Sequence, residues 1–152
     1  MTSPLTLLMP VLPGTSAVTV VATLTTLLPT IEAALASIGT VHYARLVLLD
    51  RSQPNLQPDL FSLLPSDNLV IGIITSFDGD FGPYIHDFTV QLSAEFDKTL
   101  SLVVGGAALT PVVDHEAEFE AFIAENNASQ HIPNTYFFAA YQHTVQDILA
   151  AI

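Results

Sequence analysis

The chain has 152 residues, half of them apolar, which is the size of one ordinary domain with a single sizeable core. It carries three basic residues against fifteen acidic ones, so a phosphate backbone would repel it and an anionic membrane would not attract it. It has no cysteine, which excludes disulfides, thiolate chemistry and zinc sites of the cysteine-rich type.

The first part of the chain predicts a strand, a helix and a second strand. Leu5–Val11 (LTLLMPV) is a short apolar run of the kind found in strands. Apolar residues at three-four spacing predict a helix over Thr15–Ile38, with Gly39 as its C-cap. Pro29 removes a backbone donor inside this helix, so a kink or break is expected there. Val41–Asp50 (VHYARLVLLD) is rich in branched and aromatic residues and predicts the second strand.

The rest of the chain predicts two more strands and three helices. Asn68–Phe77 (NLVIGIITSF) is the clearest strand, and its two apolar faces place it in the centre of a sheet. Helices are expected over Tyr84 to about Val104 and over Asp114–Ala124. Thr135–Tyr141 (TYFFAAY) predicts the last strand, and Thr144–Ile152 a terminal helix.

This order of elements is the ferredoxin-like βαββαβ order with additional short helices, and it predicts an α+β fold in which residues 1–152 form a single domain. Such a domain has a four-stranded antiparallel sheet with helices on one face. The apolar residues on the other face need a cover, and a homodimer through this open face is expected to supply it.

The N-terminal stretch MTSPLTLLMPVLPG is apolar but has no basic n-region, which argues against a signal peptide. Threonines, prolines and charges interrupt the apolar stretches before they reach about 18 residues, the length that a membrane-spanning helix needs. We therefore expect a soluble, cytoplasmic protein with neither membrane nor nucleic acid as a partner.

The stretch SFDGDFGPYIHDF follows the central strand and has two interpretations. In the first, Asp80 caps the next helix while Asp78 and Gly79 form the turn that leaves the strand. In the second, Asp78, Asp80 and either His86 or Asp87 converge on a metal ion. The spacing lacks the pattern and the final glutamate of a calcium loop, so the sequence favours the cap and no metal site.

His42 and Arg45 are the residues of the second strand whose side chains are best suited to acid–base chemistry or to binding a charged ligand. They are three residues apart, so alternation predicts that they point to opposite faces of the sheet. His42 is either a hydrogen-bonded core residue or, if its face lines a cavity, the best available general acid or base. Arg45 could pair with Asp78 or Asp80, or bind an anionic ligand.

Other candidate ligands have simpler structural interpretations. Asp114 and the glutamates that follow it suit the start of a helix, because the helix dipole favours negative charge there. His131 and His143 flank the predicted last strand, and their spacing does not separate a ligand from a boundary residue. The aromatic residues between them are expected to divide between the core and the open face.

The segments LTLLMPVLPG, GTVHYARLVLLD, LVIGIITSFDGDFGPYIHDF and IPNTYFFAAYQHTVQDI together resemble a group of uncharacterised bacterial proteins. That group is similar to the dimeric α+β barrel superfamily, which includes antibiotic-biosynthesis-type monooxygenases. The resemblance covers nearly the whole chain and is more specific for fold than for chemistry, because this superfamily also holds haem enzymes, isomerases and ligand-binding regulators.

The resemblance implies oxidation of an apolar or aromatic small molecule without a cofactor, with His42 as the catalytic acid or base. The ligand-binding residues would then be Tyr43, Arg45, Phe77, Tyr84 and Tyr136. Two alternatives stay open: a non-catalytic binding or interaction module, and a haem-binding protein of the same superfamily. Haem would be held by His86, His115 or His143.

Overall fold

The computed structural model describes all 152 residues as an α+β fold, in which a three-stranded antiparallel sheet carries helices on one face. The strands are β1 (Thr2–Pro10), β2 (Val41–Asp50) and β3 (Leu69–Asp78). Their order across the sheet is β1-β3-β2, so β3 is central, as its two apolar faces predicted.

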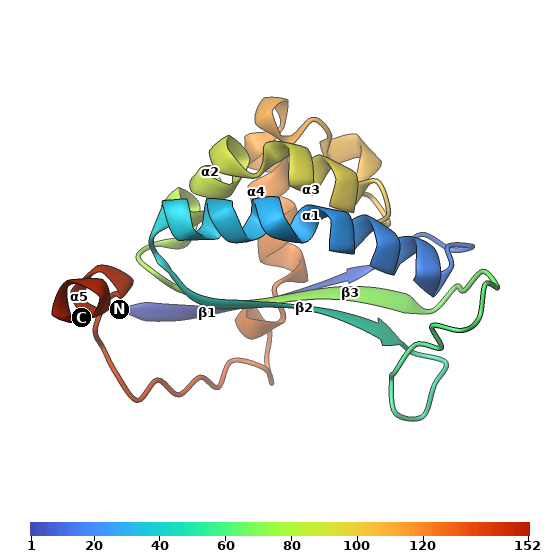
Figure 1. The fold of residues 1–152 in the computed structure, drawn as a ribbon, viewed down its shortest axis with the longest axis horizontal. Helices are drawn as coiled ribbons and strands as arrows, with labels where there is room; N and C mark the ends of the chain where they lie inside the picture. The colour runs from blue at the N-terminus through green and yellow to red at the C-terminus, as the bar shows by residue number, and fades with distance from the viewer.

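Helices form a layer above the sheet, and the last helix lies beside the N-terminus (Figure 1). The α-helices are α1 (Ala17–Ile38), α2 (Phe81–Gln91), α3 (Ser93–Leu100), α4 (Glu116–Asn126) and α5 (Val145–Ala151). Three short 3₁₀ helices are η1 (Ala107–Leu109), η2 (Val112–Asp114) and η3 (Ala128–Gln130).

The core lies between the sheet and this helical layer. Alternate residues of β1 and β3 point toward the helices, and three of them, Leu7, Met9 and Ile71, are at most 1% exposed. The remaining residues face the other way, and we call this side the open face. It includes Thr2, Pro4, Thr6, Leu8, Pro10, Tyr43, Arg45, Val47, Leu49, Val70, Gly72, Ile74, Ser76 and Asp78.

The sequence predicted a kink or a break at Pro29, and the break does not occur, because α1 continues through this residue. The proline deprives the carbonyl of Thr25 of its helical donor, but both residues are exposed, so water can take the donor's place. The expected C-cap is confirmed: Gly39 adopts the left-handed conformation (φ 71°) and its N–H bonds the carbonyl of Leu35.

The same continuity makes α1 the one helix that is long and apolar enough to cross a membrane by length and composition. This corrects the expectation that threonines and Pro29 keep every apolar stretch too short. Within the fold, α1 buries Ala17, Val20, Leu24 and Leu27. A helix that packs on a sheet meets the same criterion of length and composition.

The fourth strand expected at Thr135–Tyr141 is not a strand, so the full ferredoxin-like βαββαβ arrangement is not confirmed. In that arrangement the last strand pairs with the outer edge of β1. Here Asn127 and Ser129 take this edge: the Thr6 N–H donates to Asn127 Oδ1 (3.0 Å), and Ser129 Oγ donates to the carbonyl of Pro4 (3.1 Å). Figure 1 shows the following residues passing beneath the open face to α5. We call residues 131–152 the C-terminal arm.

The single helix expected over Tyr84 to about Val104 is two helices, because α2 ends at Gln91 and α3 begins at Ser93. Asp80 occupies the N-cap position of α2 as predicted, but its side chain makes no capping hydrogen bond. The N-cap of α4 is His115 and not Asp114, although Glu116 and Glu118 do lie in its first turn.

Candidate active site

His42 and Asp78 form a hydrogen-bonded pair at one end of the open face. His42 Nε2 lies 2.8 Å from Asp78 Oδ1, and the two side chains are 18% and 10% exposed. The Thr2 hydroxyl, on the neighbouring strand, lies 3.3 Å from both groups and donates to the carboxylate. A carboxylate accepting from one ring nitrogen fixes the orientation of an imidazole and leaves the other nitrogen for chemistry.

A β-bulge places His42 on this face. Val41 pairs with Phe77, and Tyr43 pairs with Ser76, so His42 is an extra residue in β2 and the alternation shifts at this point. The expectation that His42 and Arg45 point to opposite faces is therefore wrong. The hydrogen bond to Asp78 puts His42 on the open face, where the register also puts Arg45.

Asp78 joins three parts of the chain. Its Oδ2 accepts from the backbone N–H of Val145 (2.7 Å), the first residue of α5, while its Oδ1 faces His42 and Thr2. Burial by itself would raise the pKa of Asp78, but the hydrogen bonds from Val145, His42 and Thr2, with the charge of His42, lower that pKa overall. The carboxylate is therefore held in its charged form, in which it can orient His42.

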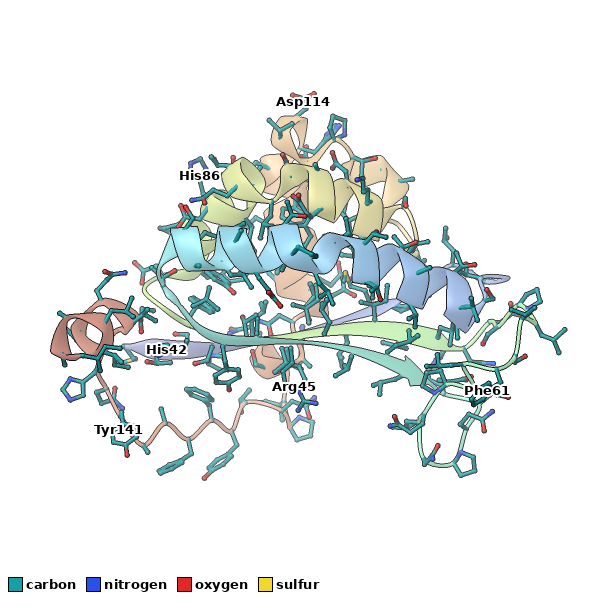
Figure 2. The ribbon with its side chains drawn as sticks, in the orientation of Figure 1. His42, Arg45, Phe61, His86, Asp114 and Tyr141 are labelled. Atoms are coloured by element: carbon teal, nitrogen blue, oxygen red, sulfur yellow. The ribbon has the colours of Figure 1, made fainter.

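A recess of about 290 Å³ lies next to this pair. One side is the sheet, through Thr2, His42, Tyr43 and Ser76, and the other side is the arm, through residues 137–141. His143 and Ile148 complete the lining. Figure 2 shows Tyr141 on the arm below His42. The recess thus combines an oriented histidine with aromatic and apolar walls, which suits a small aromatic ligand.

Two of the residues expected to bind a ligand, Phe77 and Tyr84, lie in the core instead. Their rings stack at 3.8 Å between centroids, and each residue is 2% exposed. The Tyr84 hydroxyl lies 2.7 Å from that of Thr75, and burial raises the pKa of Tyr84. Neither aromatic residue lines the recess, because both side chains point from β3 and α2 into the helical layer.

The other expected ligand-binding residues lie on the open side of the sheet. Tyr43 lines the recess and is 52% exposed. Arg45 lies on the arm's side of the sheet (Figure 2) and makes no ion pair, so the expected pairing with Asp78 or Asp80 is not formed. Tyr136 belongs to the arm but is 87% exposed and lies outside the recess lining.

A second, apolar cavity of about 140 Å³ lies on the helical side of the sheet. Leu24, Ile31 and Phe88 are among its walls, and Glu32 and Glu95 are its acidic residues. The Thr75 hydroxyl reaches this cavity but is already bonded to Tyr84. Arg45 also lines this cavity, but none of its ionisable side chains is oriented by a hydrogen-bonded partner as His42 is by Asp78, so the cavity is the weaker candidate for chemistry.

The three histidines considered for haem do not gather at one site, because His143 lies at the recess while His86 and His115 belong to the helical layer. Figure 2 shows His86 in the helical layer, on the other side of the sheet from Tyr141. Its Nδ1 lies 2.7 Å from Glu116 Oε1. His115 begins α4, and His143 lines the recess. No group of three or more histidine and carboxylate side chains is arranged to hold a metal ion, so Asp78, Asp80 and His86 do not converge.

His86 offers a direct test of the local electrostatics. The hydrogen bond that His86 donates to the Glu116 carboxylate, followed by the charge of Glu116, raises the pKa of His86 above 6.5. The pair therefore stabilises the fold at low pH and loses that contribution as the pH rises through the raised pKa. We expect Glu116→Gln to return the pKa of His86 toward its ordinary value, as measured by NMR titration of the ring. An unchanged pKa in this variant would contradict the ion pair.

Comparisons with family models, with curated proteins and with solved structures found no match to this chain.

Proposed function

We propose that this protein binds an apolar or aromatic small molecule in the recess beneath the open face and that His42 acts there as a general acid or base. The observation that carries the proposal is the His42–Asp78 pair at the wall of the recess, 2.8 Å apart. Aromatic side chains of the arm form the facing wall, so a flat ligand would lie between the sheet and the arm.

The geometry supports a specific role for each nitrogen of His42. When Nε2–H donates to Asp78, Nδ1 carries the lone pair and makes no hydrogen bond within the chain. A ligand hydroxyl placed at Nδ1 can pass its proton to the ring, and Asp78 then stabilises the imidazolium that forms. This is the division of labour found in other carboxylate–histidine pairs.

A phenol is the ligand class that fits both parts of the recess. Its ring suits the apolar wall, and its hydroxyl is acidic enough to lose a proton to an imidazole base held close by. Removing that proton gives a phenolate and an imidazolium. The cofactor-free oxidation suggested by the resemblance would start from such an anion. A phenol and dioxygen would then give a quinone and water, with one oxygen atom entering the ring and the phenol supplying all four electrons.

The probe 2-naphthol tests binding and proton transfer separately. Binding should raise its fluorescence anisotropy. Because excited 2-naphthol is a strong acid, an adjacent base takes its proton and the emission changes from the naphthol band to the naphtholate band. We expect His42→Gln to retain the anisotropy change and to lose most of the naphtholate emission of the bound probe.

His86→Gln is the matched control, because it removes an exposed histidine on the other side of the sheet. It should behave like the wild type in both measurements. Equal naphtholate emission from the wild type and His42→Gln would overturn the role of His42 as a base. Absence of any anisotropy change in the wild type, with 2-naphthol and with 2,7-dihydroxynaphthalene, would overturn the proposed ligand class.

A further inference from the structure

The C-terminal arm is poorly buried for a segment of its composition. None of residues 131–152 is buried, and only four of them, Phe137, Ala139, Thr144 and Val145, are partly covered. The large apolar residues that it exposes are Ile132, Tyr136, Phe138, Tyr141, Ile148, Leu149 and Ile152. Isolated exposed apolar residues are normal, but so many in one short segment indicate an interaction surface.

This burial does not compensate for the cost of holding the arm in place. Fixing the backbone of one residue costs about 1–2 kcal/mol, and burying a large apolar side chain returns about 1.5–3 kcal/mol. In the single chain, Tyr136 and Phe138 remain 87% and 74% exposed, so these side chains gain little of the free energy that burial would provide. Segments that stay disordered are poor in aromatic residues, whereas TYFFAAY is rich in them, so the arm has the composition of a segment that becomes buried.

The backbone of the arm shows the same lack of partners. No N–H or C=O group of residues 135–143 makes a hydrogen bond within the chain, although TYFFAAY has high β-propensity. The sheet also has a strand edge whose backbone groups lack partners. The outer edge of β2 forms no hydrogen bonds along Val41–Leu49, whereas Asn127 and Ser129 cover the outer edge of β1.

The free edge of β2 also lacks most of the features that protect sheet edges. Lysine and proline are the common protectors, and neither occurs in VHYARLVLLD. Arg45 and the bulge at His42 are its only protection. A long apolar edge of this kind is available for pairing with another strand.

We propose that residues 135–141 form the fourth strand in a second copy of this chain, by pairing with the outer edge of its β2. The arm stays anchored to its own body at both ends, through Ser129 to β1 and through Val145 to Asp78. It runs as a separate layer beneath its own open face (Figure 1). The sheet of a second copy, packed against that face, would lie in the same layer as the arm.

The partner is a second copy because one chain contains both halves of the interaction. Each copy has one unpaired arm and one unpaired β2 edge. In a dimer with a two-fold axis, the arm of each copy pairs with the β2 edge of the other, and no arm or edge stays unpaired. The apolar residues of the two open faces, such as Val47 and Ile74, are covered in the same step. The inference stands on backbone pairing and burial and is independent of any role of His42.

Proline in the arm is the first test. Because residues 139 and 140 make no backbone hydrogen bonds within the chain, Ala139→Pro/Ala140→Pro should leave the monomer fold intact. Successive N–H groups of a strand point to opposite sides, so the double variant removes one donor to the partner's β2 whichever of the two residues faces it. The matched control is Ala139→Ser/Ala140→Ser, which keeps both donors. By sedimentation velocity over a wide concentration range, we expect the wild type and the serine variant to be dimers and the proline variant to dissociate at least tenfold more easily.

The absence of cysteine allows a second test of which strands pair. Ala44→Cys on the edge of β2 and Ala140→Cys on the arm are made in separate chains, together with Phe138→Cys to sample a second register. Mixing an edge variant with an arm variant under mild oxidation should give a disulfide between the two chains. Arm cysteines mixed with a Glu118→Cys variant, on exposed α4, should give none.

Two results would overturn the proposal. One is a wild-type protein that remains a monomer at the highest concentration, whether its arm is ordered or not. The other is a dimer with the same dissociation constant in the proline variant, together with no crosslink between arm and edge. Circular dichroism and thermal unfolding of the proline variant at a concentration where it is monomeric verify that its fold is retained.

Discussion

Tyr84→Ala should lower the free energy of unfolding by about 3–5 kcal/mol, the range measured for truncating large aromatic residues in a core. Tyr84 lies between Phe77, on which it stacks at 3.8 Å, and Phe88, whose ring centroid is 4.4 Å away. Phe96 and Phe119 continue this chain of rings. Removing Tyr84 opens a cavity at the contact between β3 and α2. Urea unfolding of the variant and the wild type measures the resulting loss in the free energy of unfolding.

The Tyr84 hydroxyl should contribute a smaller and separable part. Tyr84→Phe leaves the Thr75 hydroxyl without its partner at a site 2% exposed, which costs about 1–3 kcal/mol. Thr75→Val/Tyr84→Phe replaces both partners by apolar groups and should recover most of this loss. A double variant as unstable as the sum of the two single variants would show that the hydroxyl pair is not a coupled unit.

The sequence predicts the sheet well where packing alone decides the structure. Val41–Asp50 is a strand with the predicted bounds, and β3 is the central strand, as the apolar residues on both of its faces predicted. Gly39 ends α1 because only a residue without Cβ easily adopts its left-handed conformation. These features depend on periodicity and on local backbone sterics, which one sequence contains.

The fourth strand could not be predicted correctly because its formation depends on which segment of the chain pairs with the outer edge of β1. TYFFAAY has strand propensity, but propensity does not tell which edge is free. Asn127 and Ser129 are polar residues near a helix end that the sequence suggests are loop. In the fold they bond to β1 and exclude a strand there, and the isolated bridge between Leu7 and Asn127 shows the same contact.

The candidate site was predicted in part. His42 could be singled out from its residue type on an apolar strand, but its partner Asp78 was interpreted as a turn residue. The missing information is the bulge, because a single extra residue moves a side chain from one face to the other. Without it, strict alternation sets His42 against the helices and separates it from Asp78.

Asp78→Ala should loosen the arm and change how stability depends on pH. The Val145 N–H loses its charged acceptor, and α5 has no buried residue that would hold it in place without this hydrogen bond. Hydrogen exchange in Val145–Ala151 should therefore become faster than in the wild type, while exchange in β3 changes little. Unchanged exchange in α5 would contradict the anchoring role of Asp78.

The sign of the pH effect follows from the direction of the pKa shift. The pKa of Asp78 is lower in the folded chain than its ordinary value of 3.8, so its contribution is present above that value and is lost as the pH falls through the folded pKa. Between about pH 5 and pH 2, the stability of Asp78→Ala should fall less steeply than that of the wild type. Parallel curves in this range would mean that the carboxylate does not stabilise the fold through its charge.

Asp78→Asn separates the two roles of this carboxylate. The amide oxygen can still accept from Val145, so the arm should stay attached, but the amide NH₂ would then face His42 and donate to Nε2. That contact favours the tautomer with the proton on Nδ1, which removes the lone pair from the nitrogen that serves as the base. We therefore expect this variant to keep slow exchange in α5 and to bind 2-naphthol while losing the naphtholate emission. Wild-type naphtholate emission from Asp78→Asn would show that His42 needs no carboxylate to accept the proton.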